Sequence, residues 1–387
     1  MIYLTILCLL KKRIAKKKRK RTRKWLEALP VPSRFLYMHA RLRLALKWTL
    51  RCMIRESRDS HKKERVSMQY RKLGTTGLEV SNLCLGTMAF GRWIDEKASA
   101  AILHSAIDNG ISFIDTANYY GKGQDEEFRY GTGESEEIIG RALKGKRDDV
   151  VLATKVGIAV GKGQNDKGLS RTHIMREVDN QLRRLQTDYI DLYQVHLFDP
   201  NTPMEETLRA LDDLVRQGKV RYIGCSNYAA WQIAKSHHIS DKMNLEKFIS
   251  VQPQYNLLSR EIEQELLPFS QSEGVGVMVY SPLARGMLSG KYKTPNDVPP
   301  ESRAAHGEKL LRNYFTDQNF QLVEQYRKLA EKNEVSLSQF ALSWVLNQPA
   351  VTSSIIGASK LHHVTDAVEI SDWTWSEELL NTVNSLY

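Results

Sequence analysis

The sequence predicts an α/β protein built as a closed (β/α)₈ barrel of the TIM class, with an N-terminal β-hairpin plugging its bottom. Two observations favour this class. From residue 81 onward, eight short runs rich in β-branched residues alternate with amphipathic helical stretches, the pattern of parallel strands joined by crossover helices. These runs lie in one body of 320 residues, which favours a closed barrel over an open doubly wound sheet.

The elements follow in a regular order. Strands are predicted at residues 83–86, 113–115, 150–155, 190–195, 221–225, 249–252, 275–280 and 353–356. Helices are predicted at 97–109, 134–143, 171–185, 204–217 and 261–273. The turns at Gly74 and Gly77 mark residues 70–80 as the hairpin. Residues 291–317 form a long polar loop, and loops of that length are usually functional lids or disordered.

Charge divides the chain into two parts. The formal net charge of the 387 residues is +11. Residues 1–67 contain 21 Lys and Arg against 4 Asp and Glu, a net of +17, so residues 68–387 carry −6. We therefore predict a basic N-terminal extension, residues 1–67, and a barrel domain, residues 68–387. A mildly acidic barrel gives no reason to expect a nucleic-acid partner.

Two interpretations of the extension stay open. Its clustered Lys and Arg could tether nucleic acid or anionic lipid. Alternatively, Met68 is a natural start for the folded body, and residues 1–67 are disordered or are upstream sequence translated from a wrongly chosen start codon. The second interpretation is favoured. The apolar run 2–10 is too short to span a bilayer, so no membrane association is expected.

The cysteines have neither CxxC nor Cys/His metal spacing. They are Cys8, Cys52, Cys84 and Cys225. Widely separated cysteines of this kind are typical of reduced thiols in a cytoplasmic protein. We therefore expect a cytoplasmic protein without a metal site.

Polar residues end three consecutive predicted strands, the place where barrel enzymes carry their active sites. Asp115 and Lys155 are 40 residues apart, and Lys155 and His196 are 41 apart, about one strand–helix unit each. Their side chains should therefore meet at one mouth of the barrel. Tyr120, five residues after Asp115 and directly before Gly121, can fold back over that mouth.

These four residue types together predict a proton-donating site. A nearby ammonium stabilises a phenolate, so Lys155 should lower the pKa of Tyr120. Asp115 would hold Lys155 charged, and His196 can donate a hydrogen bond to a carbonyl oxygen or relay a proton. Such a site polarises a carbonyl and protonates the oxygen as hydride arrives. The absence of a nucleophile, a metal cluster and a carboxylate pair argues against acyl transfer, zinc hydrolysis and glycoside cleavage.

Several motifs in fixed order resemble the aldo-keto reductase superfamily, in its bacterial type related to the potassium-channel β-subunit branch. They are FIDTANYYG, ATKVG, DLYQVH, GCSN, VQPQYN and YSPLARGMLSGKY, and the resemblance covers residues 68 to about 370. It implies an oxidoreductase that uses NADP(H), or else NAD(H), on a small-molecule carbonyl substrate. It also implies a catalytic tetrad of Asp115, Tyr120, Lys155 and His196, with Tyr120 as the general acid.

The resemblance further implies a cofactor site. Ser226, Asn227 and Gln252 would hold the nicotinamide carboxamide, and Tyr280 would stack on the ring. The segment expected to wrap the pyrophosphate and nearby ribose contains Ser281, Pro282, Leu283, Gly286, Ser289, Gly290 and Lys291. Further contacts are expected at Gly86, Thr87, Met88, Gly357, Ser359 and His363.

The adenosine end departs from the family pattern. Ser359, His363, Asp366 and Ala367 occupy the places that grip the 2′-phosphate and adenine. Ala367 replaces the usual Asn and removes an amide that would bond the adenine. The preference for NADP over NAD therefore stays open.

A second function is kept as an alternative: a cofactor-binding regulatory or partner subunit resembling potassium-channel β subunits. His196 favours an enzyme, since that branch typically carries Asn at this place. The mouth loops 121–133, 159–168 and 198–204 are polar and rich in Gly, so we expect a small or hydroxylated aldehyde or ketone as substrate. No motif indicates an oligomeric state.

Overall fold

The computed structural model describes residues 68–387 except 123–129, 295, 301, 303 and 306–308. The predictions for the extension 1–67, and for Cys8 and Cys52, therefore lie outside the described residues. None of the described helices is long and apolar enough to cross a membrane.

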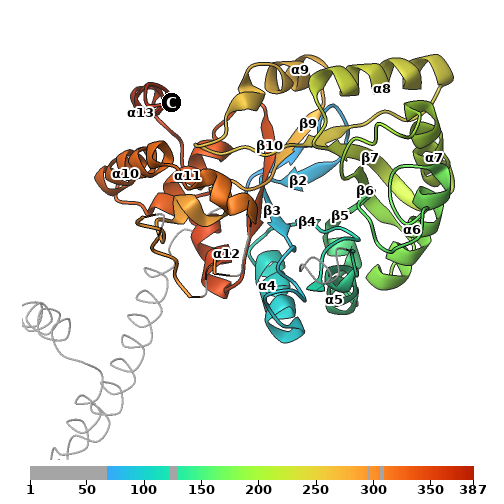
Figure 1. Ribbon diagram of the computed structural model, residues 1–387, viewed down its shortest axis with the longest axis horizontal. Helices are drawn as coiled ribbons and strands as arrows, with labels where there is room; N and C mark the ends of the chain where they lie inside the picture. Colours follow the sequence, from blue (N-terminus) through green and yellow to red (C-terminus); the bar gives the residue numbers. More distant parts are fainter. Residues whose placement is uncertain (1–67, 123–129, 295, 301, 303, 306–308) are drawn as a thin grey trace, which may run out of the picture. The chain divides into compact units, whose positions relative to one another are not determined.

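Eight parallel strands close into a barrel, as the sequence predicts (Figure 1). They follow one another in chain order, and the last pairs with the first. The strands are β3 (Leu83–Gly86), β4 (Phe113–Asp115), β5 (Val151–Val156), β6 (Ile190–Val195), β7 (Val220–Ser226), β8 (Ser250–Gln252), β9 (Gly276–Val279) and β10 (Val351–Gly357). Each predicted strand agrees with the observed one within two residues at either end.

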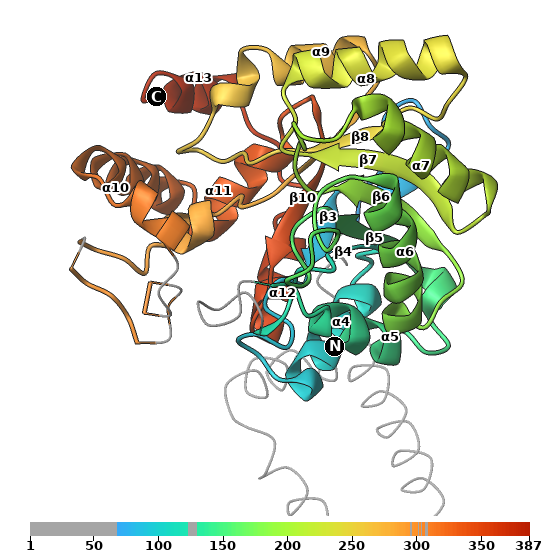
Figure 2. The same cartoon turned by 45° about the vertical axis from the view of Figure 1, so that its right-hand side comes forward.

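The crossover helices pack side by side around the outside of the barrel (Figures 1 and 2). They are α4 (Glu96–Asp108), α5 (Glu134–Ala142), α6 (Arg171–Leu185), α7 (Met204–Arg216), α8 (Ala230–Met243) and α9 (Leu266–Ser272). Four more follow: α10 (Asp317–Lys332), α11 (Leu337–Leu346), α12 (Leu361–Val368) and α13 (Glu377–Asn384).

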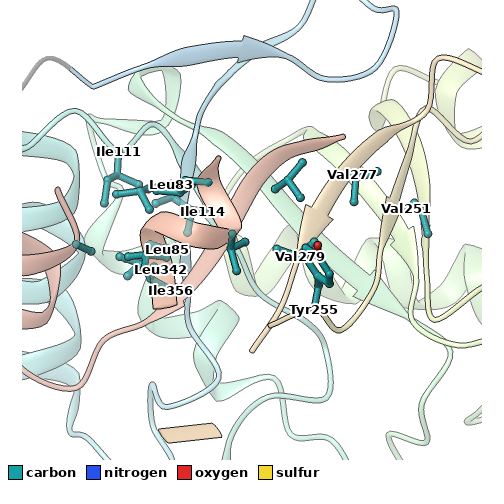
Figure 3. Close-up of a cluster of buried hydrophobic side chains, with 14 of the residues drawn as sticks. Leu83, Leu85, Ile111, Ile114, Val251, Tyr255, Val277, Val279, Leu342 and Ile356 are labelled. Carbon is teal, nitrogen blue, oxygen red and sulfur yellow. The ribbon is translucent and has the colours of Figure 1, made fainter. Parts of the chain in front are cut away.

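Strand alternation sorts the apolar side chains into two clusters. Leu83 and Leu85 of β3 point outward and join the large cluster between strands and helices, which also contains Leu342 of α11 (Figure 3). Cys84 lies between them in sequence and belongs to a smaller cluster with Phe113. Because successive strand side chains face opposite sides, this smaller cluster fills the barrel interior.

The N-terminal hairpin closes one end of the barrel. It consists of β1 (Tyr70–Lys72) and the antiparallel β2 (Glu79–Ser81). Leu73 and Val80 have no exposed surface and belong to the interior cluster. Gly74 has φ 64°, and a Cβ there would lie 2.5 Å from the backbone oxygen of Gly274. Only glycine allows the hairpin to approach the backbone of Gly274 this closely. With Leu73 and Val80 buried in the interior cluster, the hairpin is the predicted plug.

One predicted helix is divided in the structure. Instead of a continuous helix over 261–273, a 3₁₀ turn (Glu261–Glu263) precedes α9. Pro268 lies in the first turn of α9, where its missing N–H is tolerated, but a longer helix would bring its ring against the carbonyl of residue 264. Part of the predicted loop 291–317 is also ordered as a 3₁₀ segment (Lys309–Tyr314).

We predict that Leu73→Ala destabilises the protein by about 2 to 5 kcal/mol, because it leaves a cavity in the barrel interior. Gly77→Ala is the control in the same hairpin. A Cβ at Gly77 meets no atom within 4 Å, so its effect should stay below about 1 kcal/mol. Denaturant unfolding of both variants measures the difference, and equal stabilities would contradict the plug.

Candidate active site

A buried ion pair joins the ends of two neighbouring strands. Asp115 ends β4, and Lys155 lies one residue before the end of β5. Lys155 Nζ is 2.6 Å from Asp115 Oδ2, and the two side chains are 0% and 3% exposed. Lys155 Nζ also donates to the backbone oxygen of Thr116 at 2.9 Å. These partners replace the water that each charge loses on burial.

Two interior amides complete the surroundings of Asp115. Gln252 Nε2 of β8 donates to Asp115 Oδ1 at 2.9 Å, and Gln194 Nε2 of β6 donates to it at 3.2 Å. Gln194 is absent from the candidates predicted from sequence. A signal was available, because Gln194 stands two residues after Leu192, which faces the interior, and strand side chains alternate with a period of two.

Tyr120 and His196 lie against the ion pair. Tyr120 Oη accepts a hydrogen bond from Lys155 Nζ at 3.3 Å. The Tyr120 ring meets the His196 ring edge-on, with centroids 6.0 Å apart. The structure therefore brings together all four residues of the predicted tetrad, and Tyr120 is the tyrosine whose hydroxyl Lys155 contacts.

Burial dominates the acid–base properties of this group. It raises the pKa of Tyr120 by more than the Lys155 ammonium lowers it. Lys155 lowers the pKa of the phenol, as the sequence predicts, but burial raises it and the pKa lies above its usual value. Burial and Lys155 hold the pKa of His196 well below its usual range. At neutral pH the phenol is protonated and the imidazole is neutral.

Lys155 itself stays charged. Burial would lower its pKa, but the Asp115 carboxylate, the Tyr120 oxygen and the hydrogen bonds to both together raise it. A cation, a protonated phenol and a neutral imidazole thus face one another, which is an arrangement suited to donating a proton.

The residues predicted to contact the nicotinamide form an adjoining hydrogen-bonded group. Ser226 Oγ donates to the backbone oxygen of Gln252 at 2.9 Å. Asn227 Nδ2 donates to the backbone oxygen of His196 at 3.1 Å, and Tyr280 Oη donates to Asn227 Oδ1 at 2.8 Å. Gln252 directs its Nε2 at Asp115, and its contact with the carboxamide stays a prediction.

The predicted pyrophosphate segment has an unusual backbone. The left-handed φ region is occupied by Ser281, Ala284, Arg285 and Gly286. A Cβ at Gly286 would lie 3.0 Å from Lys291 Cε, so the glycine leaves room for the lysine beside this turn. Ser289 Oγ donates to the backbone oxygen of Gly286 at 2.7 Å. The other predicted contacts are the buried Pro282 and the half-buried Leu283 and Gly290.

Three more predicted cofactor residues follow one another at the end of β3. Gly86 pairs with Gly357 of β10. A Cβ at Gly86 would lie 2.6 Å from Ile355 Cγ2, which makes this a close approach. Thr87 Oγ1 donates to the backbone oxygen of Asp115 at 3.0 Å and so joins the end of β3 to the end of β4. Met88 is half-buried.

The last two predicted residues stand at the start of α12. Ser359 N donates to His363 Nδ1 at 3.3 Å. Burial lowers the pKa of His363, as do the neighbouring His362, Lys360 and Lys291. Lys291 therefore acts electrostatically on this segment, and the two predicted phosphate-binding stretches adjoin one another.

The chemistry of the remaining candidates is limited. Cys84 and Cys225 are free and buried, and burial raises the pKa of both thiols well above its usual value, so they are poor nucleophiles. Among the residues described, no group of three or more His, Cys, Asp or Glu side chains could hold a metal ion.

Comparison with known proteins finds relatives across the barrel. The model of the "Aldo/keto reductase family" matches residues 82–387. An "Uncharacterized oxidoreductase YrpG" from Bacillus subtilis (strain 168) is 39% identical, over 83% of this chain and 96% of that protein. A "Probable voltage-gated potassium channel subunit beta" from Oryza sativa subsp. japonica is 37% identical, over 79% and 92%. An "Aldo-keto reductase YhdN" from Bacillus subtilis (strain 168) is 36% identical, over 82% and 93%.

The depressed pKa of His196 predicts a pH effect on stability. Unfolding restores an ordinary imidazole with a pKa near 6.5, so below that pH the unfolded state binds a proton that the folded state does not. Stability is then lost as pH falls toward the folded pKa, at up to about 1.4 kcal/mol per pH unit. We expect His196→Asn to flatten this loss in denaturant unfolding between pH 7.5 and 5. Parallel curves for the variant and the parent would contradict the assignment.

Proposed function

The chain belongs to the aldo/keto reductase family, and on that premise we propose that it reduces an aldehyde or ketone to the alcohol with NADP(H), Tyr120 being the general acid. The reverse oxidation uses the same site. The observation that carries the proposal is the 3.3 Å contact of Lys155 Nζ with Tyr120 Oη, supported from behind by Asp115. A bound reduced nicotinamide supplies the hydride. The chain supplies the proton.

Each residue has a distinct part in that proton transfer. Tyr120 is protonated before reaction, and it donates as negative charge develops on the carbonyl oxygen. The phenolate that remains is stabilised by Lys155, whose charge Asp115 maintains. His196 is neutral and offers the same oxygen a hydrogen bond without carrying a charge of its own. The site thus favours the developing oxyanion over the neutral carbonyl.

The cofactor residues fit a dinucleotide. The left-handed residues from Ser281 to Gly286 lie beside Lys291, and a glycine-containing turn next to a cation suits a pyrophosphate. Lys360 and Lys291 lower the pKa of His363 while Asp366 raises it, so two cations and one carboxylate lie near the place where a 2′-phosphate would add negative charge. This supports NADP(H) over NAD(H), although Ala367 provides no amide for the adenine.

We propose a small or hydroxylated carbonyl compound as substrate, on the polar character of the mouth loops. Part of one loop, residues 123–129, lies outside the described residues. A cytoplasmic location is proposed from the buried free thiols of Cys84 and Cys225, since cysteines stay reduced in that compartment.

The second candidate function is a cofactor-binding partner subunit. The Oryza sativa relative, whose name describes a probable potassium-channel β subunit, favours it. His196 favours the enzyme, because the β-subunit branch that this sequence resembles typically carries Asn there. Carbonyl reduction by the purified protein separates the two candidates.

We predict that Tyr120→Phe removes carbonyl reduction while NADPH binding survives. The substitution keeps the ring and loses the proton, and general acid catalysis contributes about 10²- to 10⁴-fold. Tyr119→Phe is the matched control. Turnover at saturating NADPH, on a panel of aldehydes, measures both. If the control loses activity and Tyr120→Phe keeps it, the assignment is wrong; if the parent binds NADPH but reduces no carbonyl, the partner-subunit function is the better one.

We also predict that Lys291→Ala weakens NADPH binding. Loss of a charge-assisted phosphate contact costs about 1.5 to 3 kcal/mol, roughly 10- to 150-fold in Kd. Lys293→Ala is the control, since Lys293 is exposed and stands outside the predicted segment. Fluorescence titration with NADPH and NADH measures the change. An unaltered NADPH Kd would refute the placement of the phosphate segment.

A further inference from the structure

A buried polar cluster lies outside the barrel, between its strands and the helices α5 and α6. We define the α5–α6 cluster as Glu136, Glu177, Gln181 and Arg184. Glu136 and Gln181 have no exposed surface, and Glu177 is 3% exposed. Helices α5 and α6, which carry it, pack against each other (Figure 2). Burying these polar side chains between the helices and the barrel is costly unless they are hydrogen-bonded. Their hydrogen-bond partners therefore show which parts of the fold the cluster holds.

Glu136 accounts for the first half of the cluster. Its Oε1 accepts from Thr154 Oγ1 at 2.6 Å and from Gln181 Nε2 at 2.7 Å. Its Oε2 accepts from Arg184 Nε at 2.6 Å. Gly133 leaves room for this arginine, since a Cβ there would lie 2.4 Å from Arg184 Nε. This half ties α5 to α6 and to β5.

Glu177 accounts for the second half, through two asparagines. Asn118 Nδ2 donates to Glu177 Oε2 at 3.0 Å, and Asn180 Nδ2 donates to Glu177 Oε1 at 2.7 Å. Arg184 Nη2 lies 3.6 Å from Glu177 Oε2. Asn180 belongs to the same helix as Glu177, whereas Asn118 comes from the segment after β4. The Asn118 bond therefore connects two separate parts of the fold.

Asn118 stands between Asp115 and Tyr120, where the chain leaves the barrel. Asn118 is 1% exposed, and its backbone N–H donates to the backbone oxygen of Lys155 at 3.2 Å. Gln181 Nε2 donates to the same oxygen at 3.1 Å. The strand end that carries Lys155 and the segment that carries Tyr120 are thus held from one buried cluster.

We propose that Asn118, anchored on Glu177, is a positioning residue that sets the distance between Tyr120 and Lys155 during proton transfer. The inference rests on the proposed function, because the transfer it serves is the one assigned to Tyr120. Asn118 has no part in the tetrad or the cofactor segment. A hydrogen bond to a carboxylate is about twice as strong as one between neutral groups, which suits it to holding a loop.

The test exchanges the donor and the acceptor of the Asn118–Glu177 hydrogen bond. Asn118→Asp changes almost no volume but sets a second carboxylate against Glu177. Combining it with Glu177→Gln restores the bond, because the introduced amide can donate to the introduced carboxylate. Asn180→Asp is the matched control, since it places the same charge against the same glutamate from within α6. All variants are measured for kcat, NADPH Kd and backbone hydrogen exchange over residues 116–122, with thermal unfolding to verify folding.

We expect Asn118→Asp to lose up to about 10²-fold in kcat, the scale of a displacement of about 1 Å near the reacting groups. Its NADPH Kd should stay unchanged, and the double variant should regain most of the turnover. Exchange should accelerate at Tyr120, whose N–H bonds Ala117 O, in Asn118→Asp and not in Asn180→Asp.

Retained kcat in a folded Asn118→Asp, or a double variant as slow as the single one, would overturn the inference. A parent that reduces no carbonyl would instead defeat the proposed function. Hydrogen exchange would still decide the anchor in that case, since equal rates in Asn118→Asp and Asn180→Asp would show that Glu177 does not hold this segment.

Discussion

The Asp115–Lys155 ion pair is the constraint on which the site depends. A fully buried ammonium is stable only when its charge is paired and its donors are bonded. Here Asp115, the Thr116 carbonyl and the Tyr120 phenol provide those contacts. The partners of the carboxylate come from β6 and β8, across the barrel. Because strands β4, β5, β6 and β8 all contribute, the pair is satisfied only once the barrel closes.

The same constraint divides the barrel interior into two layers. The hairpin side chains Leu73 and Val80 fill one end together with Cys84 and Phe113. The polar layer lies at the other end, where the strands finish. The layers adjoin, since along the paired strands β3 and β4 Cys84 lies opposite Phe113 and Gly86 lies opposite Asp115. An apolar floor excludes water from beneath the ion pair, and the low dielectric there strengthens its attraction.

The barrel, its strands and the meeting of Asp115, Tyr120, Lys155 and His196 could be predicted because each leaves a local signal. Strand runs end in polar residues at a repeat of one strand–helix unit, and this spacing holds for Asp115, Lys155 and His196. Contacts between distant segments leave no such signal. The bond from Gln194 to Asp115 spans 79 positions and that from Asn118 to Glu177 spans 59. The lowering of the Tyr120 pKa by Lys155 could be predicted and the opposing effect of burial could not, because proximity to Lys155 can be inferred from sequence and the extent of burial cannot.

The effect of burial bears on how Tyr120 would act as the proposed proton donor. If Lys155 alone set the pKa of Tyr120, moving the phenol away from Lys155 would raise that pKa. Burial opposes the lowering of this pKa by Lys155, and the pKa lies above its usual value, so in the proposed reaction the phenol is protonated at the start and needs the ammonium chiefly once the proton has left. The stabilisation of the phenolate then depends on the 3.3 Å separation, since Coulomb attraction in a buried site falls with distance while water cannot compensate. Geometry, more than the resting pKa, is therefore what the surrounding fold must hold, and a buried anchor such as Glu177 is suited to that task.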